Sequence, residues 1–201
     1  MPGPLEGIKI VEMGTMIAVP GATHLLATQG ASVVKVEDTS GGDDLRRYGS
    51  QRNGMSGWFA NANAGKRSIG IDLAPAEGKE ILWKLLDDAD VFIQGFRPGA
   101  VDRLGFDPDT VLARNPALVY VAASGFGATG PYAERPVYDP VIQALAGWAG
   151  SQVDADGVPT LIRGFVADKV AAYTSAQAIT AALVSRGRTG RGQLIEMSML
   201  E

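Results

Sequence analysis

Apolar positions along this chain follow two alternating patterns. Short runs rich in valine and isoleucine, such as residues 32–36, alternate with longer stretches whose apolar positions recur at helical spacing, such as 81, 82, 85 and 86. The first pattern is typical of buried strands, and the second of helices that cover a sheet. The expected strands span residues 8–11, 32–36, 68–72, 91–93, 118–121 and 194–199, and the expected helices span residues 20–29, 75–86, 107–114, 140–148 and 166–184.

The order of these elements predicts the architecture. The first strand, a helix opened by Pro20 and ended by Gly30, and the second strand form a βαβ unit with an expected right-handed crossover. Residues 38–57 follow neither pattern and are expected to form a loop. The chain therefore predicts an α/β fold, a Rossmann-like open parallel sheet with flanking helices, over residues 1–201. Because the sequence stops directly after the last strand pattern, we expect the complete protein to continue.

Composition narrows the functional classes. The 201 residues are 46% hydrophobic and 20% charged, which suits one globular domain. A net charge of −4 argues against a broad electropositive surface for nucleic acid. The chain has no cysteine, which excludes disulfides and thiolate nucleophiles and fits a reducing compartment. With no signal-peptide pattern and no apolar run of about 18 residues, we expect a cytoplasmic protein that does not enter a membrane.

Several familiar catalytic arrangements lack their residues. The single histidine, His24, lies within the first expected helix and is interpreted as structural. Neither the G-x-S-x-G signature of serine hydrolases nor the HExxH signature of zinc proteases occurs, and no metal site is expected. Catalysis would therefore depend on carboxylates, tyrosine, lysine or the backbone.

The segment 125–130 has the G-x-G-x-x-G spacing of a dinucleotide site and follows an expected strand. Such a site requires a helix that begins at the glycines, so that its N-terminus meets the pyrophosphate. Pro131 and Pro136 prevent that helix. We therefore interpret the glycines as allowing a close approach of the backbone to a ligand or another strand.

Basic residues recur near the ends of the expected strands. Arg97 and Arg103 follow the strand 91–93, and the carboxyl ends of parallel strands are where open α/β sheets bind ligands. These two side chains are candidates for contacts with phosphate. Lys66 and Arg67 precede their strand and fall at the opposite edge of the sheet. A solvated surface charge is the alternative interpretation for each of them.

Asp168 is the candidate carboxylate with the clearest context. It ends an apolar stretch, residues 163–168, at the start of the longest expected helix. The local pattern by itself favours a helix cap. The alternative is a poorly solvated and therefore more nucleophilic carboxylate.

Eight segments, taken in order, carry a resemblance to a known family. They read LEGIKI (5–10), GASVVKVE (30–37), NAGKRSI (63–69), GFRPG (95–99), GATGPY (127–132), YDPVIQA (138–144), AD (167–168) and TGRGQ (189–193). Together they cover nearly the whole chain. In this respect the chain resembles the family III CoA-transferases, which include formyl-CoA transferase and carnitine CoA-transferase.

The resemblance implies a role for Asp168 as the nucleophilic aspartate, which forms aspartyl anhydrides and an aspartyl-CoA thioester. It implies acyl-CoA and a carboxylic acid as substrates, with no permanently bound cofactor. It also implies an interlocked homodimer whose chains each have a Rossmann-like large domain and a small domain. Residues 1–201 would then be the N-terminal part of the large domain, without its remainder or the small domain. The implied contacts with CoA are Ile17, Ala18, Asp72, Leu73, Ala74, Gly95, Phe96, Arg97, Arg103, Val137, Tyr138 and Asp139.

Three positions depart from the patterns of related enzymes. Gly95 stands where the family usually has asparagine, which removes one side-chain contact with CoA. Ile17 stands where formyl-CoA transferase has glutamine, which argues against oxalate-type acceptors. Tyr138 stands where the racemases of the same superfamily have their histidine, which argues against proton transfer at an α-carbon. A racemase, a non-catalytic CoA-binding partner subunit and a dehydrogenase that uses the glycine motif stay as alternatives.

Overall fold

An open sheet of six parallel strands runs through the molecule in the order β5–β2–β1–β6–β7–β8. The structure is a computed structural model that describes residues 2–201. The strands are β1 (Lys9–Met13), β2 (Ser32–Glu37), β5 (Arg67–Gly70), β6 (Val91–Gln94), β7 (Val119–Ser124) and β8 (Leu194–Ser198). This architecture confirms the Rossmann-like parallel sheet expected from the sequence.

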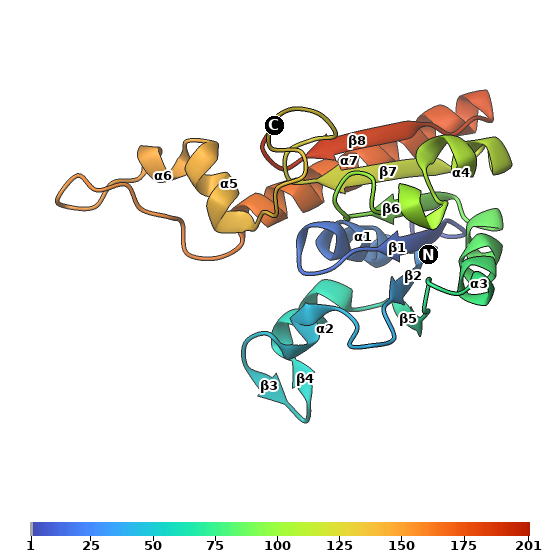
Figure 1. Ribbon diagram of the computed structural model, residues 1–201, viewed down its shortest axis with the longest axis horizontal. Coiled ribbons are helices and arrows are strands. Elements are labelled where there is room, and N and C mark those ends of the chain that lie inside the picture. Colours follow the sequence, from blue (N-terminus) through green and yellow to red (C-terminus); the bar gives the residue numbers. More distant parts are fainter. Residues whose placement is uncertain (1) are drawn as a thin grey trace.

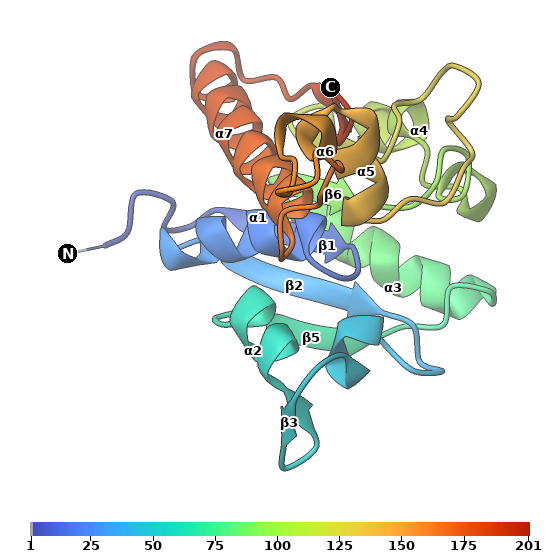
Figure 2. The same cartoon turned by 90° about the vertical axis from the view of Figure 1, so that its left-hand side faces the viewer.

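Helices cover both faces of the sheet (Figures 1 and 2). On one face α1 and α7 lie side by side, and on the other face α3 and α4 pack against the central strands. Every residue of β6 is buried, as expected for a strand covered on both sides. The helices are α1 (Ala18–Thr28), α2 (Gly57–Asn63), α3 (Ala76–Asp87), α4 (Pro108–Arg114), α5 (Asp139–Leu145), α6 (Trp148–Ser151) and α7 (Val166–Thr189).

Small residues allow α1 and α7 to approach closely. Ala171, Ala172 and Ala176 of α7 are buried in the core that α1 also enters. A Cβ atom placed on Gly21 of α1 would lie 3.0 Å from the Cβ atom of Ala172. The first turns of both helices therefore reach the same end of the sheet, beyond the carboxyl ends of the strands.

The expectation of an unstructured loop over residues 38–57 was wrong in part. A 3₁₀ turn, η1 (Asp44–Arg47), and a hairpin of β3 (Gln51–Arg52) and β4 (Met55–Ser56) lie there, followed by α2. The hairpin turns at Asn53 and Gly54, which both have positive φ angles, of 52° and 77°. Asn-Gly is the dipeptide that such two-residue turns prefer.

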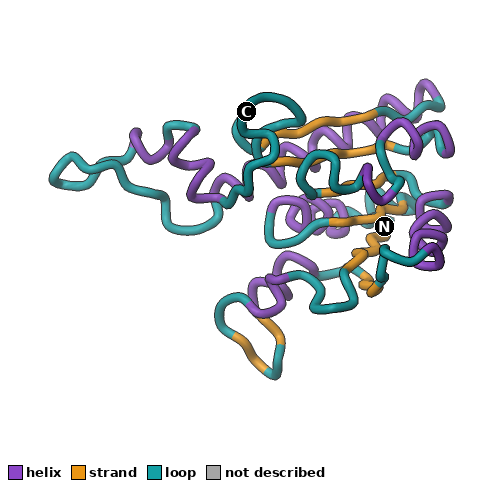
Figure 3. Tube along the Cα trace, viewed as in Figure 1, coloured by secondary structure: helices purple, strands orange, loops and turns teal. Residues whose placement is uncertain are grey.

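The single helix expected over residues 140–148 is instead two short helices, α5 and α6. Gly147 lies between them with a φ angle of 85°, a left-handed conformation that glycine adopts readily. Both helices project beyond the carboxyl ends of the strands, and a long loop leads from them to α7 (Figures 1 and 3). None of the helices in residues 2–201 combines the length and apolar character that a bilayer crossing needs.

The strand order places a topological switch point between β1 and β6. From β1 the chain first adds β2 and β5 on one side, and it later returns to add β6, β7 and β8 on the other. The loops that leave β1 and β6 therefore diverge and leave a crevice at the carboxyl ends of these strands. Open α/β sheets bind their ligands at such a crevice.

Candidate active site

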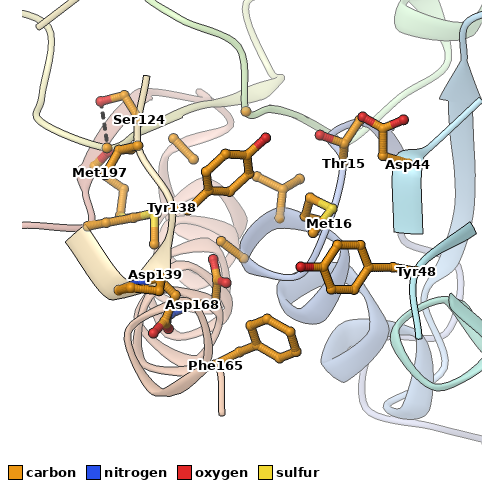
Figure 4. A pocket seen from close by; sticks show the side chains of 18 of the residues that line it. Thr15, Met16, Asp44, Tyr48, Ser124, Tyr138, Asp139, Phe165, Asp168 and Met197 are labelled. Atoms are coloured by element: carbon orange, nitrogen blue, oxygen red, sulfur yellow. Dashed lines mark hydrogen bonds between the residues drawn. The ribbon is translucent and has the colours of Figure 1, made fainter. Parts of the chain in front are cut away.

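A cavity of about 750 Å³ opens at this switch point (Figure 4). The loop after β1 and the first turn of α1 form one side, and the starts of α5 and α7 form another. Most of its lining is apolar, which suits a site that excludes water. The lining residues are Thr15, Met16, Ala18, Val19, Asp44, Arg47, Tyr48, Gly95, Ala123, Ser124, Gly125, Val137, Tyr138, Asp139, Pro140, Phe165, Asp168, Met197 and Met199.

Glycines at the strand ends let two valine side chains lie against the backbone there. A Cβ atom on Gly95 would lie 2.9 Å from a methyl group of Val19, and a Cβ atom on Gly14 would lie 2.4 Å from the same side chain. A Cβ atom on Gly125 would lie 2.0 Å from a methyl group of Val137. A larger residue at any of these positions would push a cavity-lining side chain out of place. Gly95, which stands where the family usually has asparagine, therefore leaves the space that the Val19 side chain occupies.

Asp168 lies in the first turn of α7, half-buried, with its side chain on the cavity. Burial raises the pKa of its carboxyl group to about 7, and the negative charge of nearby Asp139 adds to the rise. Neither cause is a hydrogen bond or a cation that would satisfy the ionised oxygens. The N-cap of α7 is Phe165, which has no side-chain capping bond, so the interpretation of Asp168 as the helix cap was wrong.

Asp139 supplies the cap that α7 lacks. Its Oδ2 atom accepts a hydrogen bond of 2.9 Å from the backbone N–H of Asp168, and its Oδ1 atom accepts one of 2.5 Å from Nε2 of Gln143. The Asp139 side chain is almost fully buried, at 2% exposure. An acidic group at a helix N-terminus is favoured by the helix dipole and by the unpaired amides there. Asp139 thus holds the backbone that carries Asp168.

Gln143 ties the loop before α7 to α5. Its Oε1 atom accepts a hydrogen bond of 2.8 Å from the backbone N–H of Ile162, and its Nε2 atom also donates to the carbonyl oxygen of Ile162 over 3.2 Å. Asp139 and Gln143 are four residues apart and therefore face the same side of α5. This side of α5 therefore contacts both the loop before α7 and the first turn of α7.

The predicted contacts with CoA fall into three places. Five of them, Ala18, Gly95, Val137, Tyr138 and Asp139, line the cavity, and Ile17 is buried at the start of α1 beside them. Phe96 lines a second cavity of about 340 Å³ that lies on the other side of the strand ends, and Arg97 and Arg103 are exposed close to it. Asp72, Leu73 and Ala74 form the loop after β5, the edge strand, and line neither cavity.

Both carboxylate oxygens of Asp139 are engaged within the chain. Each oxygen accepts one hydrogen bond there, and together these bonds fix the orientation of the carboxylate. Tyr138, next to it, is 66% exposed and extends over the cavity (Figure 4).

Three other candidates have clear surroundings. The side chain of Lys66 is only 2% exposed, so its interpretation as a solvated surface charge was wrong. Arg67 is exposed and donates a hydrogen bond of 3.0 Å to the hydroxyl of Ser32. His24 lies 3.1 Å, through Nδ1, from the carbonyl oxygen of Ala64, which fits a structural role.

The glycine-rich segment after β7 leads into turns, and the next helix begins only at Asp139. This confirms that the G-x-G-x-x-G spacing here does not open a helix. Gly127 and Gly130 have φ angles of 83° and 98°, which are left-handed conformations that their residue type permits.

Part of the lining escaped sequence reasoning. Asp44, Arg47 and Tyr48 come from η1 and the residue after it, in the segment that was expected to be a loop, and Phe165, Met197 and Met199 gave no local signal of a site. The only available signals were the capping residue Asp43 before η1 and the Asn-Gly turn that folds the hairpin back.

A doubly wound parallel sheet with a half-buried carboxylate at its switch point defines an α/β protein of the class that binds ligands across the carboxyl ends of its strands. Residues 5–201 match the family model described as CoA-transferase family III, and the chain belongs to that family.

The chain is 37% identical, over 98% of its length, to the succinate–glutarate CoA-transferase of Agrobacterium fabrum, of which it covers 51%. It is 35% identical, over 99% of its length, to a formyl-CoA:oxalate CoA-transferase of Escherichia coli, of which it covers 48%. The structure superimposes with a TM-score of 0.94 and 39% identity on a CaiB/BaiF family protein from Brucella suis, covering 100% of this chain and 54% of that one. The chain thus spans about half the length of the curated relatives it matches.

Proposed function

We propose that the complete protein is an acyl-CoA:carboxylate CoA-transferase in which Asp168 is the nucleophile. The observation that carries the proposal is a half-buried carboxylate with a raised pKa, facing an apolar cavity at the switch point of the sheet. Membership of the CoA-transferase family III and the names of its relatives support the reaction class. A poorly solvated carboxylate is a better nucleophile than one that water surrounds.

The reaction proceeds in four transfers. The Asp168 carboxylate attacks the thioester carbonyl carbon of the donor, the C–S bond breaks, and a mixed anhydride and CoA thiolate result. The thiolate attacks the aspartyl carbonyl and releases the first acid as a carboxylate, which leaves an aspartyl-CoA thioester. The acceptor carboxylate attacks this thioester and forms a second anhydride and CoA thiolate. The thiolate then attacks the acceptor acyl carbon, which gives the new acyl-CoA and restores the Asp168 carboxylate.

The chain's own groups have definite tasks in this scheme. Asp139 holds the backbone of Asp168 through the 2.9 Å hydrogen bond and so directs its oxygens toward the cavity. The apolar lining excludes water, which would otherwise hydrolyse the anhydrides. Arg97 and Arg103, exposed beyond the end of β6, are suited to the phosphates of CoA.

We further propose that the complete protein acts as a homodimer, on acyl-CoA and a carboxylic acid as its substrates. A racemase is less well supported, because Tyr138 stands where the racemases have their histidine, and a tyrosine hydroxyl is a poor base at neutral pH.

A trapping experiment tests the proposal. The complete enzyme is incubated with an acyl-CoA and hydroxylamine, and the mass of the tryptic peptide that contains Asp168 is measured by mass spectrometry. We expect conversion of Asp168 to a hydroxamate, which requires an activated aspartyl carbonyl. Asp156→Asn, which removes an exposed carboxylate outside both cavities, serves as the control and should give the same modified peptide. Unmodified Asp168 in an enzyme that transfers CoA at full rate would refute the covalent route, and CoA binding without any turnover would favour a binding subunit.

A further inference from the structure

Four charged side chains lie buried behind the wall of the cavity. Glu12 of β1 and Lys35 of β2 are fully buried, Asp43 is 1% exposed, and the side chain of Lys66 is 2% exposed. Lys35 Nζ lies 2.8 Å from Glu12 Oε1 and 3.0 Å from Asp43 Oδ2, and Lys66 Nζ lies 2.7 Å from Glu12 Oε2. Two carboxylates thus face two ammonium groups. We call these four residues the buried charge cluster.

Burying these four charged side chains lowers the stability that the same space could provide if apolar side chains filled it. Removing an ion from water costs several kcal/mol, and well-packed apolar residues in place of buried ion pairs are often neutral or stabilising. Burial lowers the pKa of Lys66 to about 8, although Glu12 opposes this shift. Burial would raise the pKa of Glu12, but Lys66 and Lys35 outweigh it and hold that pKa below its usual value. Glu12 and Lys66 therefore both carry their charges at neutral pH.

The buried charge cluster contacts the backbone of a segment that lines the cavity. Lys35 Nζ donates to the carbonyl oxygen of Gly14 over 2.5 Å, and Lys66 Nζ donates to that of Pro20 over 2.7 Å. Between these points, the backbone N–H of Met16 donates to Asp43 Oδ1 over 3.0 Å. Three members of the cluster thus hold residues 14–20, which include the cavity-lining part of the loop between β1 and α1.

This loop has a conformation that needs such support. Met16 has a φ angle of 63°, in the left-handed region, which costs a residue with a side chain roughly 1–2 kcal/mol. The hydrogen bond from its N–H to a buried carboxylate offsets that cost. The Met16 side chain then lines the same cavity as Asp168 (Figure 4).

Asp43 joins a second lining segment to the same cluster. Its Oδ1 atom also accepts a hydrogen bond of 2.9 Å from the backbone N–H of Leu45 and so caps η1. The residues of and after η1 that line the cavity are Asp44, Arg47 and Tyr48. The Oδ2 atom of Asp43 is paired with Lys35 by distance but is not aligned for a hydrogen bond. One carboxylate therefore fixes two neighbouring parts of the wall.

We propose that the buried charge cluster is a positioning unit, with Asp43 at its centre, which holds the wall of the cavity closed against water. The inference rests on the proposed function, because the anhydrides of that reaction must be shielded. Asp43 acts through the backbone of Met16 and Leu45 and does not touch the reacting atoms. A loosened wall admits water, so intermediates that should pass to the acceptor acid are hydrolysed instead.

The ratio of hydrolysis to transfer tests this role. The complete enzyme is supplied with an acyl-CoA and an acceptor acid, and free CoA and the new acyl-CoA are quantified in the same reaction. Asp43→Asn keeps the shape of the side chain but removes its charge beside Lys35. We expect the ratio to rise on the order of tenfold, the equivalent of weakening one charge-assisted hydrogen bond. A merely structural role would lower both products together and leave their ratio unchanged.

A milder variant guards against misfolding. Thr23, fully buried, donates a hydrogen bond from its hydroxyl to Glu12 Oε2, and Thr23→Val removes that bond without changing the shape or the charge of the side chain. It should raise the ratio a few-fold, in line with a neutral hydrogen bond of about 1 kcal/mol. Asp38→Asn, which removes an exposed carboxylate outside both cavities, is the matched control and should keep the wild-type ratio.

An unchanged ratio in folded Asp43→Asn overturns the inference, and so does an unchanged ratio in Thr23→Val if Asp43→Asn fails to fold. Asp168→Asn separates this result from the proposed function. If Asp168→Asn still transfers CoA, the proposed mechanism is wrong regardless of the cluster. If it abolishes transfer while the ratios in the Asp43 and Thr23 variants stay at the wild-type value, only the positioning role is wrong.

Discussion

The replacement of Asp139 by asparagine should lower the pKa of Asp168 and shift the activity profile toward acid. The pKa of Asp168 is about 7, against an ordinary 3.8, and the larger cause of the difference is burial, with the charge of Asp139 second. Asp139 therefore accounts for less than half of a difference of roughly 3 pH units. Asp139→Asn removes the negative charge and keeps Asp168 buried, so we expect the pKa of Asp168 to fall by about 1 unit, which corresponds to about 1.4 kcal/mol.

The same substitution should weaken the fold. The new side-chain amide would have one oxygen, whereas the carboxylate of Asp139 accepts hydrogen bonds through two, from Gln143 and from the backbone N–H of Asp168. One of these two hydrogen bonds is lost, and the new side-chain N–H₂ group faces a donor in its place, at a cost of about 1–3 kcal/mol. The thermal midpoint of unfolding should fall by several degrees, so activity is measured well below it.

The assay is the pH dependence of kcat/KM in the complete enzyme, which reports groups of the free enzyme. In the proposed mechanism only the ionised carboxylate of Asp168 attacks the thioester, so the rate of the wild type should fall as the pH decreases through about 7. In Asp139→Asn the half-maximal point on the acid side should lie near pH ~6, and in the exposed control Asp156→Asn it should stay near pH ~7. A half-maximal point that does not move, or that rises, in Asp139→Asn would show that Asp139 does not set the ionisation of the nucleophile.

Three further predictions follow from the site. Asp168→Asn should abolish transfer yet stabilise the fold at pH ~8 by at most about 4 kcal/mol. The pKa of Asp168 is higher in the folded than in the unfolded protein, so the wild type loses stability as the pH rises from 3.8 through about 7. Thermal unfolding should show the gain at pH ~8 and not at pH ~4, and equal midpoints at the higher pH would contradict this prediction. Val19→Ala should extend the cavity toward Gly14 and Gly95 and lower the free energy of unfolding by about 2 kcal/mol, because two buried methyl groups are lost. It should favour the longer acyl chain when two acyl-CoAs compete, and an unchanged preference would count against Val19 as a determinant of chain length. Arg97→Ala and Arg103→Ala should each raise KM for acyl-CoA about tenfold with kcat unchanged, and a KM insensitive to both would exclude them as phosphate contacts.

The regular parts of the fold were predictable because their signals are local. Each strand of the parallel sheet overlaps a strand expected from the sequence, and the long helix α7 begins at residue 166, where expected. It continues past the expected end at 184 to Thr189 and stops at Gly190, which has a left-handed φ angle of 71°. The hairpin β3–β4 and α2 were missed because each is too short to show a period. The local signal of this hairpin is the Asn53-Gly54 pair, which two-residue turns prefer.

A site residue could be predicted only where the residues next to it in the sequence indicate its role. Asp168 stood out because it ends an apolar stretch at the start of the longest helix, but Asp139, which caps that helix, lies 29 residues away in another helix. The two lysine partners of Glu12 lie 23 and 54 residues away, at Lys35 and Lys66. Nothing near Lys66 in sequence indicates that it is buried, because the packing of separate segments removes it from water. Pairings of this kind become visible only when the chain is folded.

The grip of α5 on α7 has a mechanical consequence. The helix that holds the backbone of Asp168 belongs to the part of the chain that projects beyond the sheet (Figure 1). A small tilt of α5 would change two properties of the reactive oxygens at once, namely their direction and the local potential that governs their protonation. A displacement of α5 would reach the backbone of Asp168 both through Asp139 and through the loop that Gln143 holds, so a contact on the outer surface of this projection would be felt at the proposed nucleophile.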